Sequence, residues 1–195
     1  MKNLSCFLVK VEGLPDDWPT HSHNPEFWVE LGRTIATYGF LEETLGKAIF
    51  ALTATKEYSD DAVAEALEKW LPKLKGALSN TLGNLIDVYA KSVREHQSGK
   101  IENFDELEEN LREAAQLRNV LCHGSWRRPD ENGASVPFFV NRQMEVFASA
   151  VDVPCLKQTR KAVVELICAV VNTVSHMGYQ FPGTAGPGKQ IWPSR

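Results

Sequence analysis

The 195-residue chain lacks any apolar run of the roughly 18 residues that a membrane-spanning helix needs. Its N-terminal apolar stretch is short and meets Lys10 at once, so no secretory signal peptide is expected. The four cysteines are far apart and form no C-x-x-C pair, which argues against a disulfide framework and indicates reduced thiols. We therefore expect a cytoplasmic protein that makes no membrane contact.

The chain also lacks an excess of positive charge, since its formal net charge is −4. This balance argues against a protein that simply coats nucleic acid. The charge is unevenly distributed, however, with a net −8 over residues 1–117 and a net +4 over residues 118–195. Arg118, Arg127 and Arg128 lie close together with no acidic residue among them. This asymmetry indicates either a local site for an anion or only an acidic solvent-facing surface elsewhere.

Apolar residues at alternating spacings of three and four predict helices over most of the chain. Pro25 suits a helix start, and Gly124 suits a helix end. The segments that fit are residues 25–55, about 60–72, 74–95, 103–123 and 154–177. The expected fold class is therefore all-α, an antiparallel bundle of about five helices.

The region between the last two helices lacks helical spacing. Two short apolar runs, residues 136–140 and 144–147, predict a β-hairpin insertion at about residues 135–149, before the last helix. The expected divisions of the chain are an N-terminal segment over residues 1–24, a helical bundle over residues 25–178 and an extended C-terminal tail over residues 179–195.

Two charged residues interrupt the apolar stripes of these helices. Glu42 falls between Tyr38 and Leu45, and Arg118 falls between Ala114 and Leu121. Because an unpaired buried charge is costly, such residues are normally paired or line a wet cleft. The spacing predicts that Glu42 and Arg118 face each other across neighbouring helices. The pair could be purely structural, or it could belong to a functional site.

His123 lies at the end of the same helix as Arg118, five residues further on. Five residues correspond to about 140° around a helix and about 7.5 Å along it, so one helix does not present both side chains together. Asn119 is four residues before His123 and shares its face. A histidine at a helix end can be a polar cap or a general acid–base group. A second copy of the helix would be one way to bring the two side chains to one substrate.

Arg118, Asn119, an apolar Val-Leu-Cys run and His123 together resemble the signature of the HEPN superfamily, named for higher-eukaryote and prokaryote nucleotide binding. That signature is an arginine, usually a polar residue, a mostly apolar stretch and a histidine. Four to six residues separate the arginine from the histidine, and this chain matches the four-residue form. The resemblance covers roughly residues 25–178.

The resemblance implies a metal-independent endoribonuclease that cleaves RNA at the cleft of a homodimer and needs no cofactor. By analogy, Arg118 would bind the scissile phosphate, and His123 would act as general acid or base. Asn119 would orient His123 or the phosphate, with Glu42 in support. Such an enzyme would suit a toxin or a phage-defence effector, with an antitoxin or another protein as partner. Cleavage is expected to leave 2′,3′-cyclic phosphate ends.

Other interpretations of the same residues remain open. Arg127 and Arg128 follow the motif and are candidates for further RNA contacts, but some members of the superfamily are non-catalytic. The alternative function is therefore a helical bundle that binds RNA, a nucleotide or another protein. An unrelated bundle that matches the motif by accident is a third possibility. Ser125 stands where one subgroup carries a tyrosine that its partner modifies, which argues against that form of regulation here.

Overall fold

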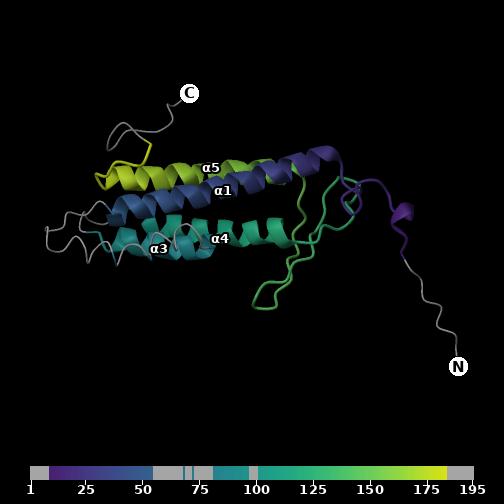
Figure 1. The fold of residues 1–195 in the computed structure, drawn as a ribbon, viewed down its shortest axis with the longest axis horizontal. Coiled ribbons are helices and arrows are strands. Elements are labelled where there is room, and N and C mark those ends of the chain that lie inside the picture. Colours follow the sequence, from purple (N-terminus) through teal and green to yellow (C-terminus); the bar gives the residue numbers. More distant parts are fainter. Residues whose placement is uncertain (1–8, 55–67, 69–71, 73–80, 97–100, 184–195) are drawn as a thin grey trace.

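The computed structural model describes residues 9–54, 68, 72, 81–96 and 101–183 (Figure 1). Within these ranges the chain forms four α-helices and one short 3-10 turn, Val11–Gly13. The helices are α1 (Pro25–Ala54), α3 (Leu82–Arg94), α4 (Phe104–His123) and α5 (Val153–His176). The all-α expectation is confirmed. None of the described helices is both long enough and apolar enough to cross a membrane.

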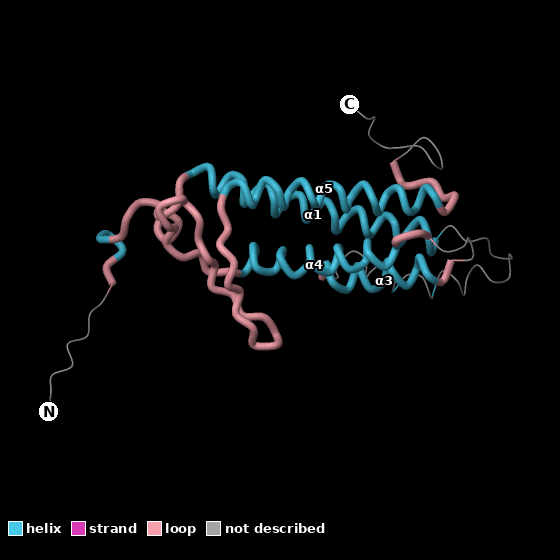
Figure 2. Tube along the Cα trace, turned by 180° about the vertical axis from the view of Figure 1, so that it is seen from behind, coloured by secondary structure: helices cyan, strands magenta, loops and turns pink. Residues whose placement is uncertain are grey.

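The helices form two layers, with α1 beside α5 in one and α3 beside α4 in the other (Figures 1 and 2). The most extensive packing is between α1 and α5. These two helices run in the same direction, because Glu26 pairs with Lys157 and Glu30 pairs with Arg160 one turn further along both helices. The expected antiparallel order holds for α3 with α4, and the first and last helices depart from it.

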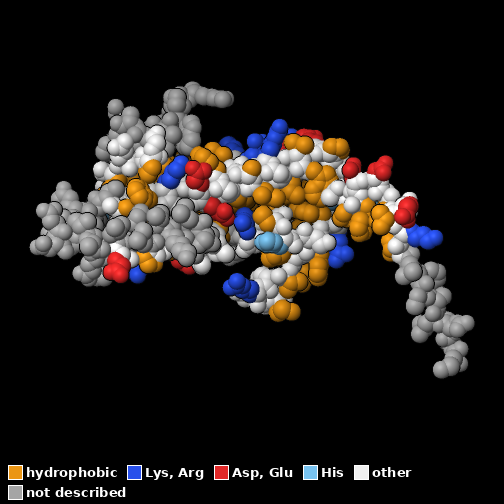
Figure 3. All heavy atoms as spheres, viewed as in Figure 1, with side chains coloured by type: hydrophobic (Ala, Val, Ile, Leu, Met, Phe, Trp, Pro, Cys, Tyr) orange, Lys and Arg blue, Asp and Glu red, His pale blue; other side chains and the backbone are white. Residues whose placement is uncertain are grey.

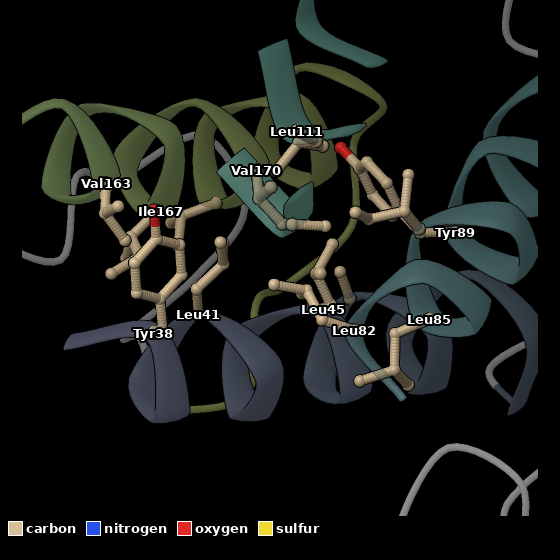
Figure 4. Packing of buried hydrophobic residues seen from close by; sticks show 14 of the residues in the cluster. Tyr38, Leu41, Leu45, Leu82, Leu85, Tyr89, Leu111, Val163, Ile167 and Val170 are labelled. Carbon is tan, nitrogen blue, oxygen red and sulfur yellow. The ribbon is translucent and has the colours of Figure 1, made fainter. Parts of the chain in front are cut away.

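A single apolar core lies between the layers (Figure 4). It receives residues from all four helices, and its largest fully buried side chains include Tyr38 and Tyr89. Burial raises the pKa of both tyrosines above the ordinary phenol range. The helices that carry the candidate site are therefore fixed against a dry interior.

Capping residues explain where the two long helices begin. Asn24 accepts a hydrogen bond at 2.9 Å from the backbone N–H of Phe27, so the predicted start of α1 at Pro25 is confirmed. Asp152 accepts from the N–H of Cys155 at 2.7 Å and starts α5 at Val153. The predicted helix over residues 60–72 lies almost wholly outside the described residues, as does the start of the predicted helix over residues 74–95.

The predicted β-hairpin at residues 135–149 is not formed. The chain does turn back there, but the described residues contain only isolated bridges, of which one, Val140 with Val146, lies within the predicted hairpin. Pro137 has no N–H for a ladder, and Phe138 pairs with Ser125, outside the predicted hairpin. Met144, with a left-handed φ of 65°, closes the turn between the two runs. Residues 124–152, called the connecting segment below, therefore form an irregular loop at one end of the bundle (Figure 2).

The described residues next to the first and last helices pack against the bundle. Phe181 is buried and Tyr179 packs against the core, so the predicted extended tail over 179–195 is wrong at its first residues. Residues 184–195 lie outside the described residues. In the N-terminal segment, His23 stacks on Phe27 with 4.3 Å between the ring centroids. Aromatic rings contribute to both contacts.

Candidate functional site

The candidate site lies where α4 ends and the connecting segment begins. His123 is the last residue of α4, and its side chain is exposed. Within the described residues it has no hydrogen-bond or ion-pair partner. In the space-filling view, a histidine, a basic group and hydrophobic side chains lie together near this end of α4 (Figure 3). The imidazole is therefore available to solvent and to a bound molecule.

Gly124 ends α4 in a way that the sequence did not predict. Its backbone is extended rather than left-handed, with φ −67° and ψ 136°. Glycine is needed here because a β-carbon would lie 2.6 Å from the carbonyl oxygen of Val120 and 2.7 Å from Cβ of Pro137. The close approach of Pro137 thus holds the connecting segment against the residue that follows His123.

Arg118 and Glu42 form the ion pair that the interrupted stripes predicted. Arg118 Nη2 lies 3.3 Å from Glu42 Oε1 on α1, and 29% of each side chain is exposed. The pair is half-buried, at the edge of the core rather than inside it. Its predicted geometry is confirmed, and its partial exposure means that an anion in solvent can reach the guanidinium.

Asn119 connects the pair to the exposed side of α4. Arg118 Nη1 donates a long hydrogen bond of 3.4 Å to Asn119 Oδ1. His123 is not part of this group, as the angular separation of about 140° along the helix requires. The structure therefore brings together Glu42, Arg118 and Asn119, and it leaves His123 on a different face of the helix from Arg118, with Asn119 one turn before His123 on its own face.

The two further arginines lie in the first residues of the connecting segment. Arg127 and Arg128 are both exposed. The Arg127 guanidinium carbon lies 5.1 Å from the ring centroid of Phe138, within the range of a cation–π contact. The positive charge predicted around the motif is therefore on the surface, beside an aromatic ring.

An aromatic cluster packs against the buried side of this part of the connecting segment. The Trp126 ring centroid lies 4.9 Å from that of Phe27 and 6.3 Å from that of His23. Burial lowers the pKa of His23, because desolvation disfavours the charged ring. His23 therefore has a packing role, which the aromatic residues near it in the sequence could have indicated.

A buried carboxylate was missed by the sequence analysis. Glu30 on α1 is only 3% exposed, and it pairs with Arg33 at 2.7 Å and with Arg160 of α5 at 3.1 Å. It stands beside Leu31 in the buried stripe, and that position was the available signal. Both arginines are partly exposed at the surface. We therefore assign the ion pairs of Glu30 with Arg33 and Arg160 to the packing of α1 against α5.

A groove of about 810 Å³ lies between α4 and α5. Tyr38 and Cys155 line it, together with apolar residues of both helices. Its carboxylates are Glu106, Glu113 and Glu165, and the described residues that line it include no lysine or arginine. This groove does not suit a polyanion such as RNA, which favours the other end of α4 as the candidate nucleic-acid site.

The described residues near the site include one cysteine, Cys122, and no cluster of metal ligands. Among the described residues, no three His, Cys, Asp or Glu side chains lie together as a metal ion would require. Cys122 is free and half-buried next to the core, where its charge would raise the pKa of Tyr38 further.

Comparison with known proteins returns no relative. A scan against protein-family models finds no match, and searches of curated proteins and of solved structures find none either.

Proposed function

We propose that the protein is a HEPN-type, metal-independent endoribonuclease that acts in the cytoplasm. The observation that carries the proposal is the composition of one helix end. An exposed His123 and a half-buried Arg118 held by Glu42 lie within the last turns of α4. Two exposed arginines, Arg127 and Arg128, follow directly.

In this proposal Arg118 binds the scissile phosphate, because its planar guanidinium matches two phosphate oxygens. Glu42 holds the arginine in place before RNA arrives, and phosphate takes over part of that contact. Asn119 lies beside the guanidinium and provides a further polar contact. The developing charge on the phosphate is stabilised by these fixed groups.

His123 supplies the proton transfers. A neutral imidazole accepts the proton of the substrate's 2′-hydroxyl as its oxygen forms a bond to phosphorus. A protonated imidazole donates a proton to the 5′-oxygen as the bond from that oxygen to phosphorus breaks. The products are a 2′,3′-cyclic phosphate and a 5′-hydroxyl. This scheme needs no oxidant, cofactor or metal ion.

We propose that the active form is a homodimer. One helix does not direct Arg118 and His123 at the same atom, and a second α4 supplies the missing group across a shared cleft. Light scattering at micromolar concentration should then give about twice the chain mass of 21.8 kDa. A strict monomer under conditions of full activity would contradict this arrangement.

The decisive experiment is incubation of the purified protein with mixed RNA in EDTA. Wild-type protein should cleave the RNA, His123→Ala should abolish cleavage, and the products should carry cyclic phosphate ends. His176→Ala is the matched control, because His176 is an exposed histidine in the last turn of α5. Cleavage that survives His123→Ala, or that requires a divalent ion, would refute the mechanism.

A second candidate function is a non-catalytic module that binds RNA, a nucleotide or another protein. The observation in its favour is the ion pair, since Arg118 is already partnered by Glu42 within its own chain. RNA binding without cleavage would support it. If the protein does cleave RNA, a role as a toxin or phage-defence effector with an antitoxin partner follows from the need to control such an activity.

A further inference from the structure

The start of the connecting segment has an inner and an outer face. Side chains alternate between the two faces, as in any extended chain. Ser125 and Arg127 are exposed, while Trp126 between them is half-buried against the aromatic cluster. The facing stretch alternates in the same way, with Pro137 buried and Phe138 exposed. The outer face thus carries a phenylalanine at a position where alternation favours a polar residue.

Phe138 is held close to the end of α4 by the backbone. The Ser125 N–H donates to the Phe138 carbonyl at 2.9 Å, and the Phe138 N–H donates to the Ser125 carbonyl at 2.8 Å. Residues paired in this way have Cα atoms about 5.5 Å apart, with both side chains on the same face. Phe138 therefore lies opposite Ser125, the residue that is two positions beyond His123.

The Phe138 ring is both accessible and electrostatically suited to a nucleobase. It is 51% exposed, although large apolar side chains are usually buried. The Arg127 guanidinium carbon lies over the ring, 5.1 Å from its centroid, so a flat cation is layered on one face of the ring and the stack can be extended by a base. Residues 114–128 contain three arginines and no acidic residue. An occupant of this face is expected to have a flat aromatic part and a negative part.

We propose that Phe138 and Arg127, called the stacking platform below, bind an unpaired RNA base next to the scissile phosphate. The substrate class would then be single-stranded RNA, because a base in a duplex has no free face for the ring. Phe138 is a substrate-binding residue in this proposal, and Arg127 contributes both stacking and charge. The proposal rests on the proposed ribonuclease function for the identity of the neighbouring phosphate.

The test measures binding separately from cleavage. Fluorescence anisotropy would follow a labelled 12-nucleotide oligouridine and a labelled 12-base-pair RNA duplex, both bound to the His123→Ala protein, which leaves the RNA intact. Loss of one base–aromatic stack typically weakens binding by about five- to 150-fold. Phe138→Ala should weaken binding of the single strand by such a factor, with little change for the duplex.

Three further variants separate stacking from bulk and from loss of fold. Phe138→Tyr should restore binding of the single strand, whereas Phe138→Leu, which keeps an apolar side chain without the ring, should not. Met144→Ala is the control, since Met144 is an 80% exposed apolar residue elsewhere in the connecting segment. It should bind the single strand like the parent protein. Circular dichroism should show unchanged helicity in all four variants.

The outcomes distinguish this proposal from the ribonuclease function. If wild-type protein cleaves RNA, and if Phe138→Ala changes neither the binding nor the cleavage of RNA, the platform is refuted and the ribonuclease function stands. If no RNA is cleaved but Phe138→Ala still loses single-strand binding, the platform stands without the cleavage step. Equal loss for strand and duplex, equal loss in Met144→Ala, or no RNA binding at all would each overturn the platform.

Discussion

Gly124→Ala is expected to destabilise the protein, although the backbone conformation at Gly124 is open to every residue. A β-carbon there would lie 2.6 Å from the Val120 carbonyl oxygen and 2.7 Å from Pro137 Cβ. Neither neighbour can move easily. The Val120 carbonyl accepts the Gly124 N–H at 2.8 Å, and Pro137 is a buried ring next to the bridge between Ser125 and Phe138. Relief of the clash must therefore shift backbone.

The expected size of the effect combines two opposing terms. Forcing a methyl group into a packed site typically costs about 1–3 kcal/mol. Alanine also restricts the unfolded chain, which offsets roughly 0.4–1 kcal/mol of that cost at a site with an ordinary φ. The middle of the two ranges gives a net loss of about 1.3 kcal/mol in the free energy of unfolding. For a domain of this size, the midpoint of thermal unfolding should fall by roughly 3–5 °C.

Gly39→Ala provides a control of opposite sign. Gly39 lies within α1, and a β-carbon there would meet no atom within 4 Å. Alanine is favoured over glycine in a helix by about 1 kcal/mol, so this variant should unfold at a higher temperature than wild type. Thermal unfolding followed by circular dichroism measures both. A Gly124→Ala variant that unfolds at or above the wild-type temperature would refute the close approach of the connecting segment to α4.

Three other substitutions test the ion pairs. Glu42→Gln should cost about 1–2 kcal/mol in unfolding free energy, between the values typical of exposed and buried pairs, and should reduce RNA cleavage by freeing Arg118. Glu30→Gln should cost more, because Glu30 is only 3% exposed; an equal or smaller loss on chemical denaturation would count against its role. Burial opposes ionisation of Glu108, but hydrogen bonds from Arg112 and Arg94 outweigh it and lower the pKa below the ordinary 4.5. Wild type should thus exceed Glu108→Gln in stability above about pH 5, and the difference should shrink as acid titrates the carboxylate; a difference that is constant with pH would refute this.

The helices were predictable because their signals are local. Asn24 and Asp152 cap their own first turns, and apolar residues recur at helical spacing. The pairing of Glu42 with Arg118 was predictable for the same reason, since each stands out within its own stripe. The degree of burial of this pair was not predictable. The buried face of α1 runs through Tyr38 and Leu41 and leaves Glu42 at its edge.

The remaining features depend on contacts between distant segments. Glu30 is held by Arg160, which is 130 residues away in the sequence, and nothing local to Glu30 indicates that partner. The hairpin prediction was wrong because residues 136–140 divide their pairing: Phe138 bridges to Ser125, and only Val140 bridges to Val146, so no ladder forms with residues 144–147. Alternation predicts which side chains face outward, but it does not select the partner strand.

The charge along α4 constrains how two copies could share a cleft. The first turns carry Asp105 and Glu106, and the acidic groove against α5 begins there. Two copies that met along this half would bring carboxylates together, which repels both the partner and RNA. From Ala114 to His123 the helix carries no acidic residue. In the proposed dimer, a two-fold contact at this half would keep the carboxylates of α4 apart and would set two copies of Arg118, each paired with Glu42, around a phosphate. The proposed dimer cleft therefore belongs at the C-terminal half of α4, where the stacking platform also lies.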